Sequence, residues 1–203
     1  MHTGLAYSFR DAADNVVRFR VRPEAHLGPQ IVNLAFNDAE NWQLVGAEAA
    51  LVYGPLSVQS EFYGSVVDRG PGASQTFTGC YAYASYFLTG ESRQYRRSTG
   101  VFDRVRPNQN FFRLCDEGGN LCTGPGAWEV GYRFSYVDLL DGLATTNGAG
   151  RVADHTFGVN WYLNPYARLM FNYVHSRADR VTGGTLIHDG RMDIFEMRAQ
   201  VDF

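Results

Sequence analysis

Lysine is absent from the sequence, so all 18 basic residues are arginine, against 21 acidic residues. The formal net charge of −3 at pH 7 argues against a nucleic-acid-binding protein, which usually carries a clustered excess of basic residues. Arginine offers planar, permanently charged donors that suit oxyanions. Genomic base composition would explain the missing lysine equally well, so this absence by itself identifies no ligand.

Long apolar runs are also absent. No stretch of 18 apolar residues occurs, which excludes a membrane-spanning helix but not a membrane β-barrel, whose strands need only about 9–11 alternating residues. The first ten residues have neither the basic region nor the apolar region of a secretory signal, so either the protein stays inside the cell or its start is missing.

Cysteine and proline are few. Three cysteines do not make a disulfide framework, and no CxxC pair or nearby histidine completes a zinc site, so we expect no metal and no cofactor. Only 7 prolines, beside 22 glycines and 14% aromatic residues, favour many short strands joined by turns, in a single domain spanning 1–203.

The dominant pattern that is present is alternation of polar and apolar residues, which recurs about every twenty residues. It predicts an all-β, antiparallel, up-and-down fold of about nine strands. They are expected at 4–10, 16–22, 42–53, 56–67, 75–89, 127–138, 152–163, 166–177 and 191–203.

The connections between these strands alternate between short and long. Tight turns at 53–56 and 163–166 stand opposite longer polar connections at 68–74, 139–151 and 178–190, as in a barrel with short turns at one rim and long loops at the other. The exception is 90–126, a connection of more than thirty residues with six arginines on the short-turn side. Such a long loop is usually functional or disordered, and we expect it to fold toward the lumen.

The last strand gives the clearest local pattern. Phe195, Met197 and Val201 face one way, and Glu196 and Arg198 face the other. The strand also ends on an aromatic residue, an ending that resembles the assembly signal of bacterial outer-membrane barrels. We therefore predict a transmembrane barrel with an apolar, aromatic band on the convex face of a curved sheet.

Six segments, in order along nearly the whole chain, together resemble the phosphate-selective porin family, the porin O and porin P group of Gram-negative outer membranes. They are 17–26, 85–91, 126–129, 159–165, 168–175 and 198–203. The resemblance implies a trimeric, water-filled barrel of 16 strands that passes anions, phosphate or polyphosphate among them. The implied partners are outer-membrane lipid, small anions and two further copies in a homotrimer.

Size sets this chain apart from that family. Nine strands in 203 residues imply roughly 360 residues for 16 strands, so the sequence looks like the carboxy-terminal half of a barrel. An odd count also places Leu5 at the outer rim if Phe203 ends at the periplasmic one. Because the periplasm is oxidising, we expect Cys115 and Cys122 to form a local disulfide.

The candidate anion pathway lies on the second strand. Arg18, Arg20 and Arg22 alternate with apolar residues, so their guanidiniums are expected about 6.8 Å apart on one face. Such donors can replace part of the water shell of a phosphate and hand it along, and Arg10 could extend the series. The alternative is an ordinary solvated strand face whose arginines pair with acids.

Three further arginines, Arg133, Arg168 and Arg198, are expected in the lumen wall. Acidic residues share that face, so we interpret these arginines as braces paired to carboxylates rather than as solute sites. The acidic residues are Glu48, Glu61, Glu129, Asp154 and Glu196.

Other classes of function are less well supported. We predict no enzyme, because the alternation puts Ser135 and His155 on opposite faces and no other histidine has an evident nucleophile. A soluble β-barrel that binds a carbohydrate or lipid remains an alternative, and it would need its apolar face inside.

Overall fold

The computed structural model describes residues 1–70, 72–96, 98–115 and 121–203, except the side chains of 113–115, 121–122 and 189. Its regular elements in these ranges are all β-strands. No helix in the described residues is both long and apolar enough to cross a membrane.

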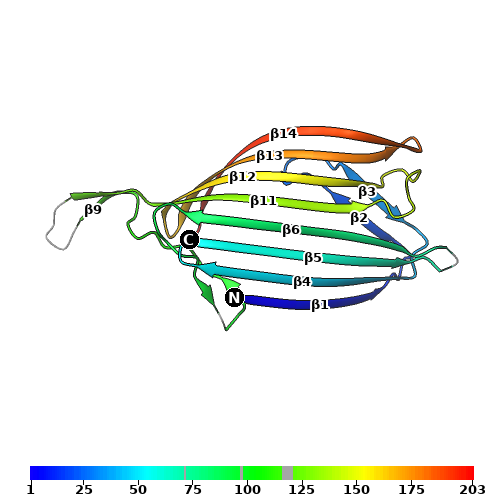
Figure 1. Cartoon of the computed structure of the whole chain (residues 1–203), viewed down its shortest axis with the longest axis horizontal. Helices are drawn as coiled ribbons and strands as arrows, with labels where there is room; N and C mark the ends of the chain where they lie inside the picture. The colour runs from blue at the N-terminus through cyan, green and yellow to red at the C-terminus, as the bar shows by residue number, and fades with distance from the viewer. Residues whose placement is uncertain (71, 97, 116–120) are drawn as a thin grey trace.

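Eight long strands form one curved antiparallel sheet in the order β1-β4-β5-β6-β11-β12-β13-β14 (Figure 1). Their bounds are β1 His2–Asp11, β4 Asn41–Tyr53, β5 Leu56–Asp68, β6 Gln75–Phe87, β11 Ala127–Leu139, β12 Gly150–Asn164, β13 Ala167–Thr182 and β14 Thr185–Val201. Neighbouring strands pair in register over nearly their full length.

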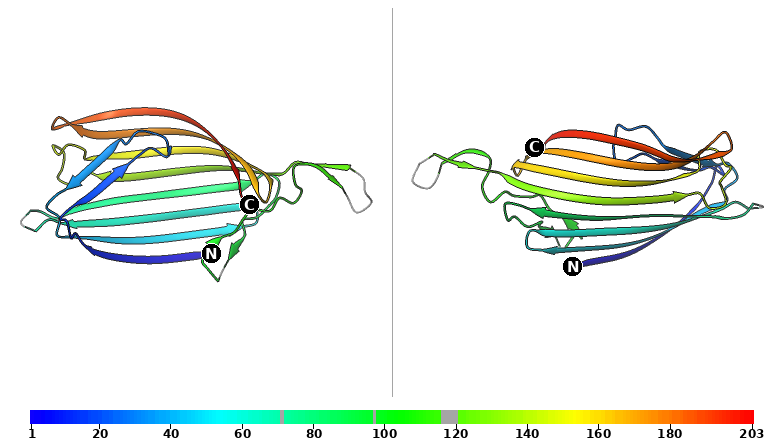
Figure 2. Two further views of the ribbon diagram at one scale, coloured as in Figure 1. Left: turned by 180° about the vertical axis from the view of Figure 1, so that it is seen from behind. Right: turned by 45° about the horizontal axis from the view of Figure 1, so that its top comes forward.

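The sheet is an open trough rather than a closed barrel, with β1 and β14 as its edges (Figure 2). Both chain ends lie at the rim that carries the tight turns after β4 and β12. We call this the turn rim and the opposite one the loop rim. The predicted placement of Leu5 at the rim opposite Phe203 is therefore wrong, because the sheet has eight strands and not nine.

The expected strand at 16–22 is the one that does not join the sheet. Val17–Val21 forms β2, which pairs only with β3, Val32–Phe36, in a hairpin between β1 and β4. This inward hairpin lies over the concave face of the sheet near the loop rim (Figure 2). Apolar and basic residues do alternate in β2, as predicted. The apolar residues pack one face of the hairpin against the sheet, and β2 is not itself a strand of that sheet.

An apolar cluster holds the inward hairpin to the wall. Val17, Leu34 and Phe36 of the hairpin are buried together with Val67 and Phe77 of the sheet. Fully burying such side chains stabilises a protein by about 1.5–3 kcal/mol each. The hairpin is thus a fixed part of the concave wall.

The predicted loop at 178–190 is also wrong. Here β13 and β14 continue as a hairpin whose two turn residues are Gly183 and Gly184, with φ of 62° and 74°. Positive φ at both central residues is what a tight type I′ turn requires, and glycine adopts it without strain. The loop at 140–149 exists as expected and packs against the inward hairpin.

The two faces of the sheet follow the predicted alternation. Outward-facing Phe157, Phe171 and Phe195 are 54%, 41% and 82% exposed, whereas Glu129 and Asp154 on the concave face are buried. The convex face therefore carries the apolar, aromatic band and the concave face is polar, except beneath the inward hairpin.

The connection between β6 and β11 leaves from the turn rim, as expected, and has two parts. The first carries β7, Tyr95–Arg96, and β8, Val101–Phe102; Val105 packs with Phe87 and Tyr162 on the concave face. The second carries β9, Phe112–Cys115, and β10, Leu121–Gly124, and extends beyond the rim away from the sheet (Figure 1). The expected inward folding holds for the first part only.

The sulfur atoms of Cys115 and Cys122 fall outside the described residues. The backbone register places Cys115 opposite Leu121 and Cys122 opposite Leu114. Their disulfide stays a prediction.

Candidate anion pathway

The arginine face of the inward hairpin points away from the wall. Arg18, Arg20 and Arg22 are exposed, while Val17 and Phe19 pack against the apolar cluster. Since alternate residues of a strand face opposite ways, Arg18 and Arg20 of β2 face away from the wall, and Arg22 follows directly after the strand. Arg22 is further positioned by an Nη1 hydrogen bond of 2.8 Å to the carbonyl of His26.

Arg10 lies at the end of β1 next to the hairpin. Its guanidinium stands 5.5 Å from the centre of the Trp42 ring, a cation–π contact. Trp42 in turn meets the Phe19 ring edge-on at 5.9 Å. Arg10 is therefore on the concave face, beside the hairpin that carries the other three arginines.

An ion pair outside the sheet anchors the base of the hairpin. Arg69, just after β5, donates from Nε and Nη2 to both carboxylate oxygens of Asp38, with the shortest contact at 2.6 Å. This hydrogen bonding, more than charge attraction alone, lowers the pKa of Asp38 below its ordinary value.

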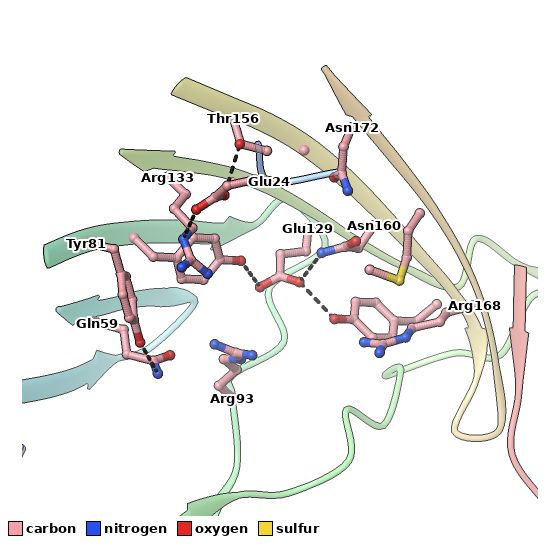
Figure 3. Close-up of a pocket in the computed structure, with 15 residues that line it drawn as sticks. Glu24, Gln59, Tyr81, Arg93, Glu129, Arg133, Thr156, Asn160, Arg168 and Asn172 are labelled. Carbon is pink, nitrogen blue, oxygen red and sulfur yellow. Dashed lines mark hydrogen bonds and ion pairs between the residues drawn. The ribbon is translucent and has the colours of Figure 1, made fainter. Parts of the chain in front are cut away.

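A polar cavity of about 350 Å³ lies on the concave face, between the hairpin and the turn rim (Figure 3). Arg93, Arg133 and Arg168 line it from three different elements. Its other polar lining residues are Glu24, Gln59, Tyr81, Tyr83, Glu129, Thr156, Asn160, Tyr162 and Asn172. A liquid water molecule occupies about 30 Å³, so the cavity has room for a hydrated solute.

Glu129 is the buried charge of this cavity, at 1% exposure. Its Oε2 accepts hydrogen bonds from Tyr162 at 2.8 Å and Asn160 at 2.9 Å, and Oε1 accepts a longer one from Tyr83 at 3.5 Å (Figure 3). These hydrogen bonds satisfy both oxygens of the carboxylate and hold the Glu129 side chain against the wall.

The three predicted wall arginines differ in their partners. Arg133 forms a 2.7 Å ion pair with Glu24, which belongs to the inward hairpin and not to the wall. Arg168 donates at 3.1 and 2.8 Å to the amide oxygen of Gln200, which is uncharged. Arg198, opposite Met170 on the edge strand, has no ion pair within the described part of the chain.

Sequence reasoning missed Arg93 and Glu24. Arg93 lies in the long connection between Tyr83 and Phe102, with its guanidinium 4.7 Å from the Phe102 ring. Its Nη1 is buried and has no hydrogen-bond partner among the residues described. Neither residue belongs to a repeating pattern; only the number of arginines in the long connection pointed to Arg93.

The structure also bears on the predicted lack of a serine–histidine pair. His155 pairs with Phe134 across β11 and β12, and Ser135 pairs with Asp154. Ser135 and His155 therefore face opposite sides of the sheet, as the sequence predicts.

Comparison with known proteins agrees with this geometry. The family model described as phosphate-selective porin O and P matches residues 1–203. Porin O of Pseudomonas aeruginosa is 30% identical over 232 aligned residues, which cover 100% of this chain and 49% of that protein. An uncharacterised protein of Caulobacter vibrioides is 33% identical over 145 residues, covering 70% of this chain and 27% of that protein.

The chain thus spans about half the length of Porin O. Its open eight-stranded sheet with an aromatic outer face fits part of a porin barrel. The match over the whole chain shows that the chain belongs to the phosphate-selective porin O and P family, the porins of Gram-negative outer membranes.

Proposed function

We propose that the whole protein is an outer-membrane porin that passes anions, phosphate or polyphosphate in particular, by passive diffusion. The observation that carries the proposal is the inward hairpin. Its apolar face is buried against the wall, and its opposite face presents Arg18, Arg20 and Arg22 to the enclosed space.

The physical basis is a set of weak, repeated sites. Each guanidinium offers forked donors to an oxyanion, and conduction needs sites that bind enough for entry but not too much for exit. Below the hairpin, Arg93 and Arg133 line the cavity and add positive charge to its wall. Glu24 and Glu129 lower the net positive charge there, which keeps the cavity from trapping an anion.

The strand number of the complete barrel and its oligomeric state are proposed from the family. The eight strands would form half of a 16-stranded barrel, and three such barrels would assemble as a homotrimer. No step uses an enzyme mechanism or a cofactor. The alternative of a soluble carbohydrate- or lipid-binding barrel would need an apolar interior, whereas the concave face here is lined by arginine, glutamate and tyrosine.

Reversal potentials in planar bilayers under a salt gradient test the pathway. We expect Arg20→Ala to weaken anion preference, since it opens a gap of about 13–14 Å between Arg18 and Arg22. The matched control is Arg151→Ala, which also removes one positive charge but from a residue paired with Asp179 outside the lumen. Unchanged anion preference in the Arg18, Arg20 and Arg22 triple alanine variant would overturn the proposal.

A further inference from the structure

On β13 and β14 the convex face changes from apolar to polar and charged toward the loop rim. Tyr173 and Phe195 are the last aromatic pair of this surface before the loop rim, with their ring centres 5.0 Å apart. The next outward pair along the strands is His175 opposite Asp193, and the pair after it is Arg177 opposite Arg191. Both arginines are exposed.

The position of the arginine pair matches the edge of the membrane. Arg177 lies ten residues beyond Ala167, where β13 begins at the turn rim. Ten residues extend about 34 Å along a strand, and a tilt of 35–45° reduces this to a height of about 24–28 Å. The apolar band of an outer-membrane barrel is about 25 Å tall, so the two guanidiniums reach the level of the lipid headgroups.

Among the acidic side chains that the structure describes, which leave out Asp189, none neutralises this pair. Asp193 accepts hydrogen bonds from Tyr173 at 2.8 Å and lies 2.7 Å from His175. Asp179 is bound by Arg151 at 2.7 Å. Among the residues whose side chains the structure describes, no carboxylate lies within 4.0 Å of the guanidinium of either Arg177 or Arg191.

Two like charges directly opposite each other on a sheet are destabilising unless an ion of opposite charge lies between them. In an antiparallel pair the two Cβ atoms are only about 4.5–5.5 Å apart. A phosphate group can accept forked hydrogen bonds from both guanidiniums at once, and it is the anion that lipid headgroups supply at this depth.

The geometry points to Arg177 and Arg191 as a binding site for the phosphate of a lipid headgroup on the outer surface of the barrel. Arg177 is oriented for this by its Nε contact of 3.3 Å with His175. Nδ1 of His175 contacts Asp193, whose carboxylate also accepts the hydrogen bond of Tyr173. By the alternation of β13 and β14, the site faces the convex side of the sheet and not the lumen. It is therefore independent of the proposed conduction pathway.

Binding of a short-chain phosphatidic acid to the protein, expressed in outer membranes and purified in a neutral detergent, tests the site. We expect Arg177→Gln/Arg191→Gln to weaken binding about 30-fold, the equivalent of about 1 kcal/mol per basic residue. Arg177→Lys/Arg191→Lys keeps both charges and should retain most of the affinity, which separates loss of the site from misfolding. Diacylglycerol of the same chain length, which lacks the phosphate, should not bind there.

Other outcomes would overturn the site. Equal lipid affinity in the glutamine and parent proteins would show that the arginines do not contact the headgroup. Competition by inorganic phosphate at the same low concentration would point to a free-anion site instead. If the glutamine variant changed from trimer to monomer while its lipid affinity stayed the same, we would conclude that this face is a contact between copies of the chain.

Discussion

The carboxylate of Glu24, on the segment that follows β2, lies 2.7 Å from Nε of Arg133 in the middle of β11. The same carboxylate accepts a hydrogen bond of 3.0 Å from the hydroxyl of Thr156, and the Glu24 backbone N–H donates to Asp154 at 3.0 Å. These contacts fasten the far end of the inward hairpin to two neighbouring strands, whereas the apolar cluster fastens its base.

We expect Glu24→Gln to loosen that end of the hairpin. Arg133 is 41% exposed, so the ion pair should contribute at most about 1 kcal/mol to the free energy of unfolding. A double-mutant cycle with Arg133→Gln, measured by urea unfolding in lipid vesicles, isolates the pair. Open-channel current noise should rise in Glu24→Gln. A coupling energy of zero together with unchanged noise would contradict the role of this contact.

We expect a larger loss of stability when a hydrogen bond to the buried carboxylate of Glu129 is removed. Tyr162→Phe removes its 2.8 Å donor and leaves a buried acceptor less well satisfied, which should cost about 1–3 kcal/mol of unfolding free energy. Tyr53→Phe, at a residue 79% exposed at the turn rim, is the control and should be near neutral. Equal stability of the two variants in urea unfolding would show that Glu129 does not depend on this hydrogen bond.

Much of the wall could be predicted from local pattern. The sequence predicts that Trp128 faces outward and Glu129 inward, because a strand with lipid on one side and water on the other alternates with a strict period of two. The same rule could not distinguish a wall strand from β2, since Val17 and Phe19 pack their side chains against the concave face of the sheet. A hairpin packed on a sheet and a strand within it give the same alternation.

The polar cavity could be predicted only in part. Arg133 and Arg168 follow from strand parity, but the partner of Arg133 lies 109 positions earlier in the sequence, at Glu24, on a segment with no regular structure. Arg93 likewise enters the cavity from the long connection. Such contacts depend on how the chain folds back over the sheet, which local periodicity does not encode.

The Asp38–Arg69 pair predicts a dependence of stability on pH. Because hydrogen bonding to Arg69 lowers the pKa of Asp38, the folded state binds fewer protons than the unfolded state near the ordinary carboxyl pKa of about 4. The stabilisation should be complete above that value and lost as the pH falls through the lowered pKa.

The measurement is the difference in unfolding free energy between the parent protein and Asp38→Asn. This difference should be constant from neutral pH to about pH 5 and should shrink below about pH 4. It should stay under about 1 kcal/mol, since Asp38 is 46% exposed and solvent screens the pair. A difference that grows on acidification would have the wrong sign for this pair.

Gly148 is where the loop after β11 meets the inward hairpin, and its substitution tests how tightly the two are joined. Its φ is +86°, and a Cβ there would lie 2.1 Å from the backbone carbonyl oxygen of Asn33. That carbonyl cannot move aside easily, because Asn33 donates its own N–H to the carbonyl of Gly148 at 3.1 Å. Gly148→Ala should therefore displace β3 as well as strain the loop.

Gly142 in the same loop is the matched control. Its φ of +63° also disfavours alanine, but a Cβ there would meet no atom within 4 Å. Gly142→Ala should cost only the backbone strain, about 1–2 kcal/mol for a left-handed residue, whereas Gly148→Ala should cost more. Only Gly148→Ala should also reduce anion preference in reversal-potential measurements, because it moves the strand paired with Arg18 and Arg20. Equal effects of the two substitutions on stability and selectivity would mean that the hairpin does not depend on this loop for its position.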